Sequence, residues 1–372
     1  MKKVSVVLLV CLAAFSIMAS CKKTNSSAAL IGIAMPETHV QRWIKDGNSL
    51  KVEAEKLGYR AEVLWGGTEQ ALQNRQIENL LAHGAKILII GNIDEGVSPM
   101  VAEAFRKNVP VIAYDRIIQD SEDYDYYITF NNFKVGVLQA TSIVNELNLD
   151  AATEPKQITL FAGSPTDANA KFFFNGAMSV LNPYIENGAL NVVGPYPKTA
   201  SDTASFHQIT TEKWQAPIAR ARMENILKND ARNVVLDAVL APNDTLARAI
   251  IEACKADAKY RTKLPVVSGQ DAEFDSAVSI KNGEQASTVF KDTAKLARAA
   301  ILLADQILKG VVPEIPGVIL ASGDLKEIGN TGKKYVNAYL LDPVLVTKEN
   351  LIIPVDAGFY DKEQAIQLKE LP

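Results

Sequence analysis

The stretch IGIAMPETHVQRWIKDGNSLKVEAEKLGYRAEVLW, residues 31–65, indicates the fold class of this chain. Its first five residues are apolar and predict a buried strand, and residues 61–65 predict a second one. Between the two runs, Ile44, Leu50 and Leu57 recur at the spacing of a helix. A buried strand, a helix and another buried strand are typical of a parallel sheet that helices cover on both faces.

The same alternation continues as far as residue 308. Further strands are predicted at 87–90, 109–114, 126–130, 158–162, 190–193, 238–241, 266–268 and 287–290. Helices are predicted at 69–83, 97–107, 133–147, 170–181, 219–227, 246–255, 274–281 and 295–308. One ordinary sheet does not hold so many strands, so we expect two doubly wound α/β domains. The periodicity leaves a single (β/α)₈ barrel open as the alternative.

Composition narrows the classes of function. The 372 residues are 48% hydrophobic and 22% charged, which suits a globular chain of roughly two domains. A formal net charge of -4 argues against nucleic acid as a partner, because proteins that follow the phosphate backbone are normally basic. With 3 Cys and 3 His, a disulfide scaffold and a multi-ligand zinc site are both disfavoured, and no motif indicates a metal or a cofactor.

The N-terminus is predicted to be an export signal over residues 1–20. A short basic start precedes an apolar run at 4–18, which is shorter than the ~20 residues of a membrane-spanning helix. Cys21 directly follows small residues and resembles the lipidated cysteine of a bacterial lipobox. We therefore expect a lipoprotein anchored at a membrane, in the periplasm or at the cell surface, with a linker over residues 21–28. Cleavage without lipidation is the alternative.

Polar side chains follow the predicted strands at their carboxyl ends, where open α/β sheets bind ligands. The candidates for ligand contact are Arg42, Trp43, Asp115, Arg116, Asp167, Asn169, Asn243, Asp271 and Lys291, with Trp214 in a polar loop. Guanidinium, carboxylate and amide groups can bridge adjacent hydroxyls of a sugar, and the two tryptophans offer planes for its C–H face. The charges of the three cations and three carboxylates sum to zero, which favours a neutral ligand.

Several of these polar residues have a purely structural interpretation as well. Asp244 and Asp292 are predicted to cap the helices that follow them. Asn243 and Asp271 can each serve a cap or a turn, and Asp115 and Arg116 can form a local salt bridge or a turn. Trp43 can occupy a core position, and Lys291 can be solvated.

Eight segments, in order along the chain, are similar to the periplasmic sugar-binding proteins of ABC importers, in the xylose-binding and multiple-monosaccharide-binding branch. They are IGIAMP at 31–36, RW at 42–43, QIEN at 76–79, IAYDR at 112–116, VGVLQ at 135–139, GSP at 163–165, SGQDA at 268–272 and VFK at 289–291. The resemblance implies a type I periplasmic binding protein, in which a three-crossing hinge joins two Rossmann-like lobes. It places residues 29–131 and 292–336 in an N-terminal lobe, and residues 132–291 and 337–372 in a C-terminal lobe.

The resemblance also implies which side chains contact the sugar. They are Arg42 and Arg116 from the first lobe, and Asn169, Trp214, Asn243, Asp271 and Lys291 from the second, with Asp115 and Asp167 beside them. Residues 167–169 read Asp-Ala-Asn where the family usually has Asp-Asn-Asn, so one amide is missing from the cleft wall and the identity of the sugar stays open. Residues 131–132 read Asn-Asn where the family often has Asp-Asn, at the first hinge crossing.

The function implied is a receptor that closes on a monosaccharide such as xylose or glucose and delivers it to an ABC permease, with neither catalysis nor a cofactor. Presentation of the sugar to a chemoreceptor or sensor kinase is one alternative, and nucleoside binding is another. A sugar-converting enzyme would use Lys291 as a Schiff-base lysine and Asp271 as a general base, but no HExxH, GxGxxG, nucleophile elbow or phosphate-binding loop supports it. A sugar-responsive repressor is opposed by the export signal.

Overall fold

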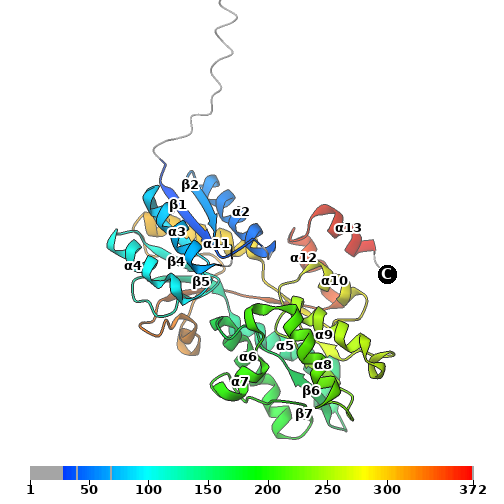
Figure 1. Ribbon diagram of the computed structural model, residues 1–372. Coiled ribbons are helices and arrows are strands. Elements are labelled where there is room, and N and C mark those ends of the chain that lie inside the picture. The colour runs from blue at the N-terminus through cyan, green and yellow to red at the C-terminus, as the bar shows by residue number, and fades with distance from the viewer. Residues whose placement is uncertain (1–27, 39–40, 68, 371–372) are drawn as a thin grey trace, which may run out of the picture.

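The computed structural model describes residues 28–38, 41–67 and 69–370. The predicted signal peptide and Cys21 lie outside these residues. Figure 1 shows two α/β halves side by side, one coloured blue to cyan and the other green to yellow, with the C-terminal segments in orange and red reaching both. None of the helices that the structure describes combines the length and the apolar character needed to cross a bilayer.

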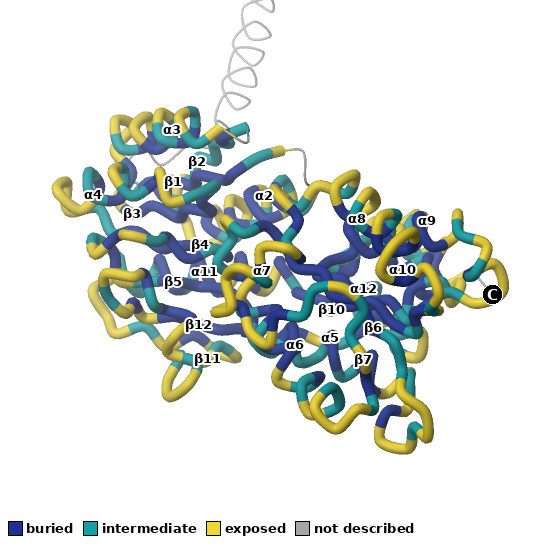
Figure 2. The backbone as a smooth tube through the Cα atoms, turned by 60° about the horizontal axis from the view of Figure 1, so that its bottom comes forward, coloured by how far each residue is buried: buried dark blue, intermediate teal, exposed yellow. Residues whose placement is uncertain are grey.

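The first half contains a seven-stranded sheet in the order β11-β12-β5-β4-β3-β1-β2. Its strands are β1 (Leu30–Met35), β2 (Arg60–Trp65), β3 (Ala85–Ile90), β4 (Val111–Tyr114), β5 (Tyr126–Phe130), β11 (Ile319–Leu320) and β12 (Asn337–Leu341). All neighbouring strands pair in parallel except β11, which pairs antiparallel with β12 at the edge. The central strands are buried on both sides, as their dark blue colour in Figure 2 shows, which explains their continuous apolar sequences.

Helices cover both faces of this sheet. Helices α2 (Gln41–Lys56) and α11 (Thr293–Leu308) bury their apolar stripes against one face. Helices α3 (Gln70–Ala82) and α4 (Ser98–Arg106) cover the other. The side chains of β1 alternate between the two resulting cores, as the period of a strand requires.

The second half repeats the plan on a smaller scale. Its parallel sheet has the order β7-β6-β8-β9, with β6 (Lys156–Leu160), β7 (Leu190–Val192), β8 (Ala238–Leu240) and β9 (Val266–Val267). Helices α5 (Asn132–Leu147), α6 (Ala168–Glu186) and α7 (Thr203–Ile209) pack on one face, and α8 (Ala216–Lys228) and α9 (Asp244–Ala256) on the other. Two separate open sheets confirm the doubly wound α/β prediction and exclude the barrel.

The remaining elements complete the second half. Strands β10 (Thr288–Phe290) and β13 (Val344–Val346) form an antiparallel pair. Next to them lie α10 (Phe274–Lys281), α12 (Ile352–Asp356) and α13 (Lys362–Glu370), which share one small core.

The chain passes between the halves three times. The passages run from β5 to α5, from β10 to α11 and from β12 to β13. The lobe boundary expected after residue 336 is corrected to lie after Leu341, because β12 pairs in parallel with β5 along its whole length and so belongs to the first sheet.

Candidate functional site

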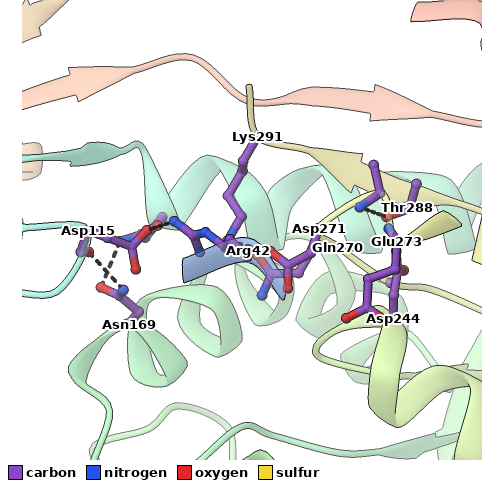
Figure 3. Close-up of polar contacts among 12 residues, drawn as sticks. Arg42, Asp115, Asn169, Asp244, Gln270, Asp271, Glu273, Thr288 and Lys291 are labelled. Atoms are coloured by element: carbon purple, nitrogen blue, oxygen red, sulfur yellow. Dashed lines mark hydrogen bonds and ion pairs between the residues drawn. The ribbon is translucent and has the colours of Figure 1, made fainter. Parts of the chain in front are cut away.

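Polar side chains from both halves meet where the strands of the two sheets end. The first half contributes Arg42, in the first turn of α2, and Asp115 and Arg116, which directly follow β4. The second half contributes residues at the start of α6 and in the loops after β9 and β10. In Figure 3, Arg42 lies between Asp115 and Asp271, and Lys291 extends toward the same space. The sequence placed these groups at strand ends, and the structure brings them together.

Arg42 is held by two carboxylates of its own half. Its Nη2 pairs with Asp115 Oδ1, and its Nε lies 3.5 Å from Oδ2 of Asp46, one helical turn further along α2. Burial disfavours the charged guanidinium, but Asp115, Asp46 and Asp271 together outweigh burial and raise the pKa of Arg42 above its ordinary value. Arg42 therefore stays a charged donor at the edge of the site.

Asp115 occupies an unusual backbone position that the loop after β4 stabilises. Its φ of 64° is left-handed, and its carbonyl oxygen accepts hydrogen bonds from Tyr127 Oη at 2.9 Å and Thr129 Oγ1 at 2.9 Å. Burial opposes ionisation of its carboxyl, but Arg42 and Lys291 overcome this effect and lower the pKa of Asp115. Its ion-pair partner is Arg42, so the local salt bridge with Arg116 does not form, whereas the backbone does bend at residues 115–116, in line with the turn that was the other alternative.

Arg116 reaches across to the second half. Its Nε lies 3.4 Å from Asp167 Oδ2, and its Nη1 donates to the carbonyl oxygen of Asn92 at 3.3 Å. Its guanidinium carbon lies 5.2 Å from the ring centroid of Trp43, and that of Arg42 lies 4.9 Å from the same ring. Cation–π contacts with one ring thus orient both arginines.

Trp43 occupies a core position, in agreement with its structural interpretation. It is 3% exposed and packs in the cluster under the first sheet. Sugar contact by Trp43 stays a prediction, because Asp115 and Lys291 of the same site are almost as buried as its ring, which two guanidinium groups contact. Its role is to support Arg42 and Arg116.

Asp167 and Asn169 join the two halves directly. Asp167 caps α6 by accepting from the backbone N–H of Asn169 at 3.0 Å, and its other oxygen faces Arg116. Asn169 Nδ2 donates to the carbonyl oxygen of Asp115 at 3.1 Å, and Asn169 Oδ1 accepts from Asn132 Nδ2 at 2.8 Å. Both side chains therefore stabilise the closed arrangement of the halves as well as lining the site.

Trp214 is the aromatic residue that the sequence placed in a polar loop, and the structure brings it to the site. Its Nε1 donates to Asp167 Oδ2 at 3.2 Å, and its ring packs edge-on against Phe173 with centroids 6.4 Å apart. The same ring lies over Gly163, where an added Cβ would come within 2.0 Å of it. Glycine at position 163 thus leaves the space that the indole occupies.

Asp271 and Lys291 form the charged pair of the second half. Lys291 Nζ lies 2.8 Å from Asp271 Oδ1 and 5.4 Å from the ring centroid of Phe173. Lys291 is 5% exposed, so the interpretation as a solvated lysine is wrong. Asp271 has a left-handed φ of 94°, an uncommon conformation for a residue with a Cβ.

In the loop after β8, the residue that caps helix α9 is not the one predicted. Asn243 caps α9 by accepting from Leu246 N at 3.0 Å, and Asp244 is the first helical residue instead of the cap. The prediction that Asp244 caps this helix is wrong, whereas Asp292 caps α11 as predicted. The side-chain oxygen of Asn243 already serves as the helix cap. Contact between Asn243 and the sugar stays a prediction.

Two residues near the site were not identified by the sequence analysis. Asn92 follows β3 as the other candidates follow their strands, it is 5% exposed, and its Oδ1 has no hydrogen-bond partner among the described residues. Asp46 is fully buried beneath Arg42. The i, i+4 spacing of Arg42 and Asp46 on one helix was the available signal for the latter.

Asp46 leads to a prediction about pH. Burial raises the pKa of Asp46 to about 6, because its effect outweighs that of Arg42, which lowers the pKa. The carboxyl group of Asp46 therefore binds its proton more tightly in the folded protein than in the unfolded chain. Its contribution to stability is greatest below pH ~4 and is lost as the pH rises to ~6. Relative to Asp46→Asn, the unfolding free energy of the wild type is expected to fall by up to about 3 kcal/mol over that window. Urea titrations at several pH values measure it, and parallel profiles for the two proteins would contradict it.

Taken together, the site offers donors and acceptors whose charges are paired, with Asp46 as a fourth carboxylate beneath Arg42. Arg42, Arg116 and Lys291 face Asp115, Asp167 and Asp271, each cation within 4 Å of one of the carboxylates. Within the described residues, no group of three or more His, Cys, Asp or Glu side chains is placed to hold a metal ion. Paired charges whose groups retain further hydrogen-bonding capacity suit a neutral ligand rich in hydroxyls.

Comparison with known proteins agrees with this fold and site. A profile described as a periplasmic binding protein domain matches residues 31–311. The chain therefore belongs to the periplasmic binding protein family, and its two sheets with three passages are the type I form of that fold.

Several relatives are sugar-binding proteins, which confirms the resemblance found in the sequence. The multiple sugar-binding periplasmic receptor ChvE of Rhizobium radiobacter is 40% identical over 90% of this chain and 91% of its own. The D-xylose-binding periplasmic protein of Escherichia coli is 33% identical over 90% of this chain and 92% of its own. A solute-binding protein of Clostridium phytofermentans, solved with β-D-glucose bound, superposes with a TM-score of 0.79 at 34% identity, covering 90% of this chain and 99% of that one.

Proposed function

We propose that this protein is an exported lipoprotein that binds a neutral monosaccharide by closure of its two lobes and delivers it to an ABC permease. The observation that carries the proposal is the convergence of paired charged donors and acceptors from both halves on one site (Figure 3). The sugar-binding relatives support a xylose- or glucose-like aldopyranose as the ligand. Lipidation at Cys21 fixes the receptor at the membrane that holds the permease.

Closure follows from differential affinity. A sugar that contacts Arg42 and Arg116 on one side and Asp271 and Lys291 on the other makes its full set of bonds only when the halves are together. The contacts between Arg116 and Asp167 and between Asn169 and Asp115 also join the halves, so protein contacts and sugar contacts act together in the closed form. The closed surface is then what the permease recognises.

The deciding experiment is a calorimetric screen of the purified protein against D-xylose, D-glucose, D-galactose and L-arabinose. At least one is expected to bind tightly, with a smaller radius of gyration in solution scattering as the lobes close. Glucose 6-phosphate is the matched control: it has the same ring with added negative charge, and Asp115, Asp167 and Asp271 should exclude it. Absence of binding to all four sugars, or preferential binding of the phosphate, would overturn the proposal.

Transport and catalysis are distinguished by separate measurements. Recovery of the bound sugar unchanged after incubation separates a binder from an enzyme. The ion pair between Lys291 and Asp271 already argues against a Schiff-base role, because that chemistry needs a neutral amine. Sugar-dependent stimulation of the permease ATPase in proteoliposomes tests delivery, and stimulation of a sensor kinase with no effect on the ATPase would favour the sensor alternative.

A further inference from the structure

The loop that presents Asp271 has a strained backbone. Asp271 and Ala272 have left-handed φ values of 94° and 48°. Two successive residues with Cβ atoms in this region need support from their surroundings to persist. Asp271 is also the acidic partner of Lys291 in the site, so whatever holds this loop determines where the carboxylate points.

Two fully buried side chains receive the backbone groups that follow Asp271. The N–H of Ala272 donates to Thr288 Oγ1 at 3.0 Å, and the N–H of Glu273 donates to Asp244 Oδ2 at 2.9 Å. The Thr288 hydroxyl in turn donates to the same Asp244 oxygen at 2.8 Å. Figure 3 shows this group beside Asp271, on the side away from Arg42.

Further bonds fix Asp244 itself. Its Oδ1 accepts from Gln285 Nε2 at 2.9 Å, and its backbone N–H donates to the carbonyl oxygen of Gln270 at 3.0 Å. An added Cβ on Gly269 would come within 2.1 Å of Asp244 Oδ1, so this carboxylate packs directly under the loop. Burial, with Glu273 and Asp271 nearby, raises the pKa of Asp244 well above its ordinary value.

We infer that Asp244 and Thr288 are positioning residues for ligand binding, which hold the loop over residues 269–273 so that the Asp271 carboxylate faces the cleft before the ligand arrives. The inference rests on the proposed function of the site. Both side chains are fully buried, so they act through Asp271 and not on the ligand. Holding a group in its bound geometry raises affinity by reducing the ordering that binding would otherwise require.

The test uses Thr288→Val, which keeps the shape of the side chain and removes its hydroxyl. Its affinity for D-glucose or D-xylose, whichever the wild type binds more tightly, is expected to fall about tenfold by calorimetry. Thr288→Ser, which retains the hydroxyl, should restore wild-type affinity. Thr159→Val is the matched control, because Thr159 is an equally buried threonine on β6 of the same half whose hydroxyl has no partner among the described residues, and its loss should leave affinity unchanged.

A double-mutant cycle separates positioning from general structural damage. In the Asp271→Ala background, Thr288→Val should cause no further loss of affinity, because the residue that it positions is gone. An equal loss in both backgrounds, or no loss in either, would overturn the inference. If Thr288→Val does not fold, Asp244→Asn takes its place in the same cycle, and the inference fails if that variant binds like the wild type.

Hydrogen exchange tests the inference without a sugar. The amides of Ala272 and Glu273 should exchange faster in Thr288→Val than in the wild type, while those of the Thr159→Val control should not change. Unchanged exchange would overturn the positioning role even if sugar binds. If the wild type binds no sugar but exchange does accelerate, the proposed function fails and the support of the loop stands.

Discussion

Replacing Arg42 by alanine is expected to lower the affinity for the monosaccharide at least about 100-fold. The guanidinium supplies several charged donors, each worth about 1.5–3 kcal/mol to a bound hydroxyl. The change also leaves Asp115 and Asp46 buried without their shared cation. We therefore expect the unfolding free energy to fall by about 3 kcal/mol as well. Calorimetry measures the first effect and urea denaturation the second.

The Arg42 prediction has two controls. Arg106→Ala removes an exposed arginine of α4 that pairs with Glu103 of the same helix, and neither affinity nor stability should change measurably. Arg42→Lys keeps the charge but cannot pair with Asp115 and Asp46 simultaneously. Its affinity for the sugar should therefore lie between that of the wild type and that of Arg42→Ala. Wild-type affinity in Arg42→Ala would remove this residue from the site.

Asp271→Ala is expected to weaken sugar binding at least about tenfold without unfolding the protein. Under the proposed function the carboxylate accepts hydrogen bonds from sugar hydroxyls, and it is the counter-charge of Lys291, which is 5% exposed and lies 2.8 Å away. With Asp271 gone, the ammonium is drawn toward Asp115, which already interacts with it electrostatically, and the arrangement of charge in the cleft changes. Calorimetry gives the affinity, and circular dichroism confirms that the fold is retained.

Two further variants sharpen the Asp271 prediction. Asp271→Asn keeps the size and one acceptor, so it isolates the contribution of the charge. Asp342→Ala removes an exposed aspartate that pairs with Lys134 at 3.0 Å, and it should bind sugar like the wild type. If Asp271→Ala and Asp342→Ala bind equally well, Asp271 does not contact the ligand.

Much of the fold could be predicted because burial leaves a simple pattern in the sequence. Strands such as β1 and β3 are buried on both faces, so their sequences are continuous apolar runs. Helices α2 and α11 bury one stripe against a sheet, which produces helical spacing. These local signals depend only on which faces are covered.

The C-terminal segment after α11 could not be assigned in the same way. β12 is a buried strand, but it pairs with β5 from far earlier in the chain, so nothing local indicates its sheet. Strand β11, at the edge of the sheet, is exposed and has only two residues. Earlier in the chain, helix α7 has seven residues in a polar segment, too few to show a period.

The sequence nominated side chains that the structure brings together, but it did not indicate how they pair. Arg42, Asp115, Arg116, Asp271 and Lys291 could be nominated because they follow strands. Which cation faces which carboxylate depends on how the two sheets meet, and the local Asp115–Arg116 pair suggested by adjacency does not form. The exchange of roles between Asn243 and Asp244 has the same origin, since Asp244 is committed to Thr288 and Gln285 from a distant segment.

By itself, the sequence determined the α/β class, the alternation of buried strands and helices, and the strand-end positions of the polar groups. These follow from burial and from the short-range geometry of the backbone, which adjacent residues largely specify. Only the tertiary structure decided that Trp43 supports two arginines, that Arg116 reaches Asp167 in the other half, and that Asp244 and Thr288 hold the Asp271 loop. Those contacts join residues far apart in the chain, and a contact of that kind is set by packing in three dimensions, which leaves no periodic trace in the order of the amino acids.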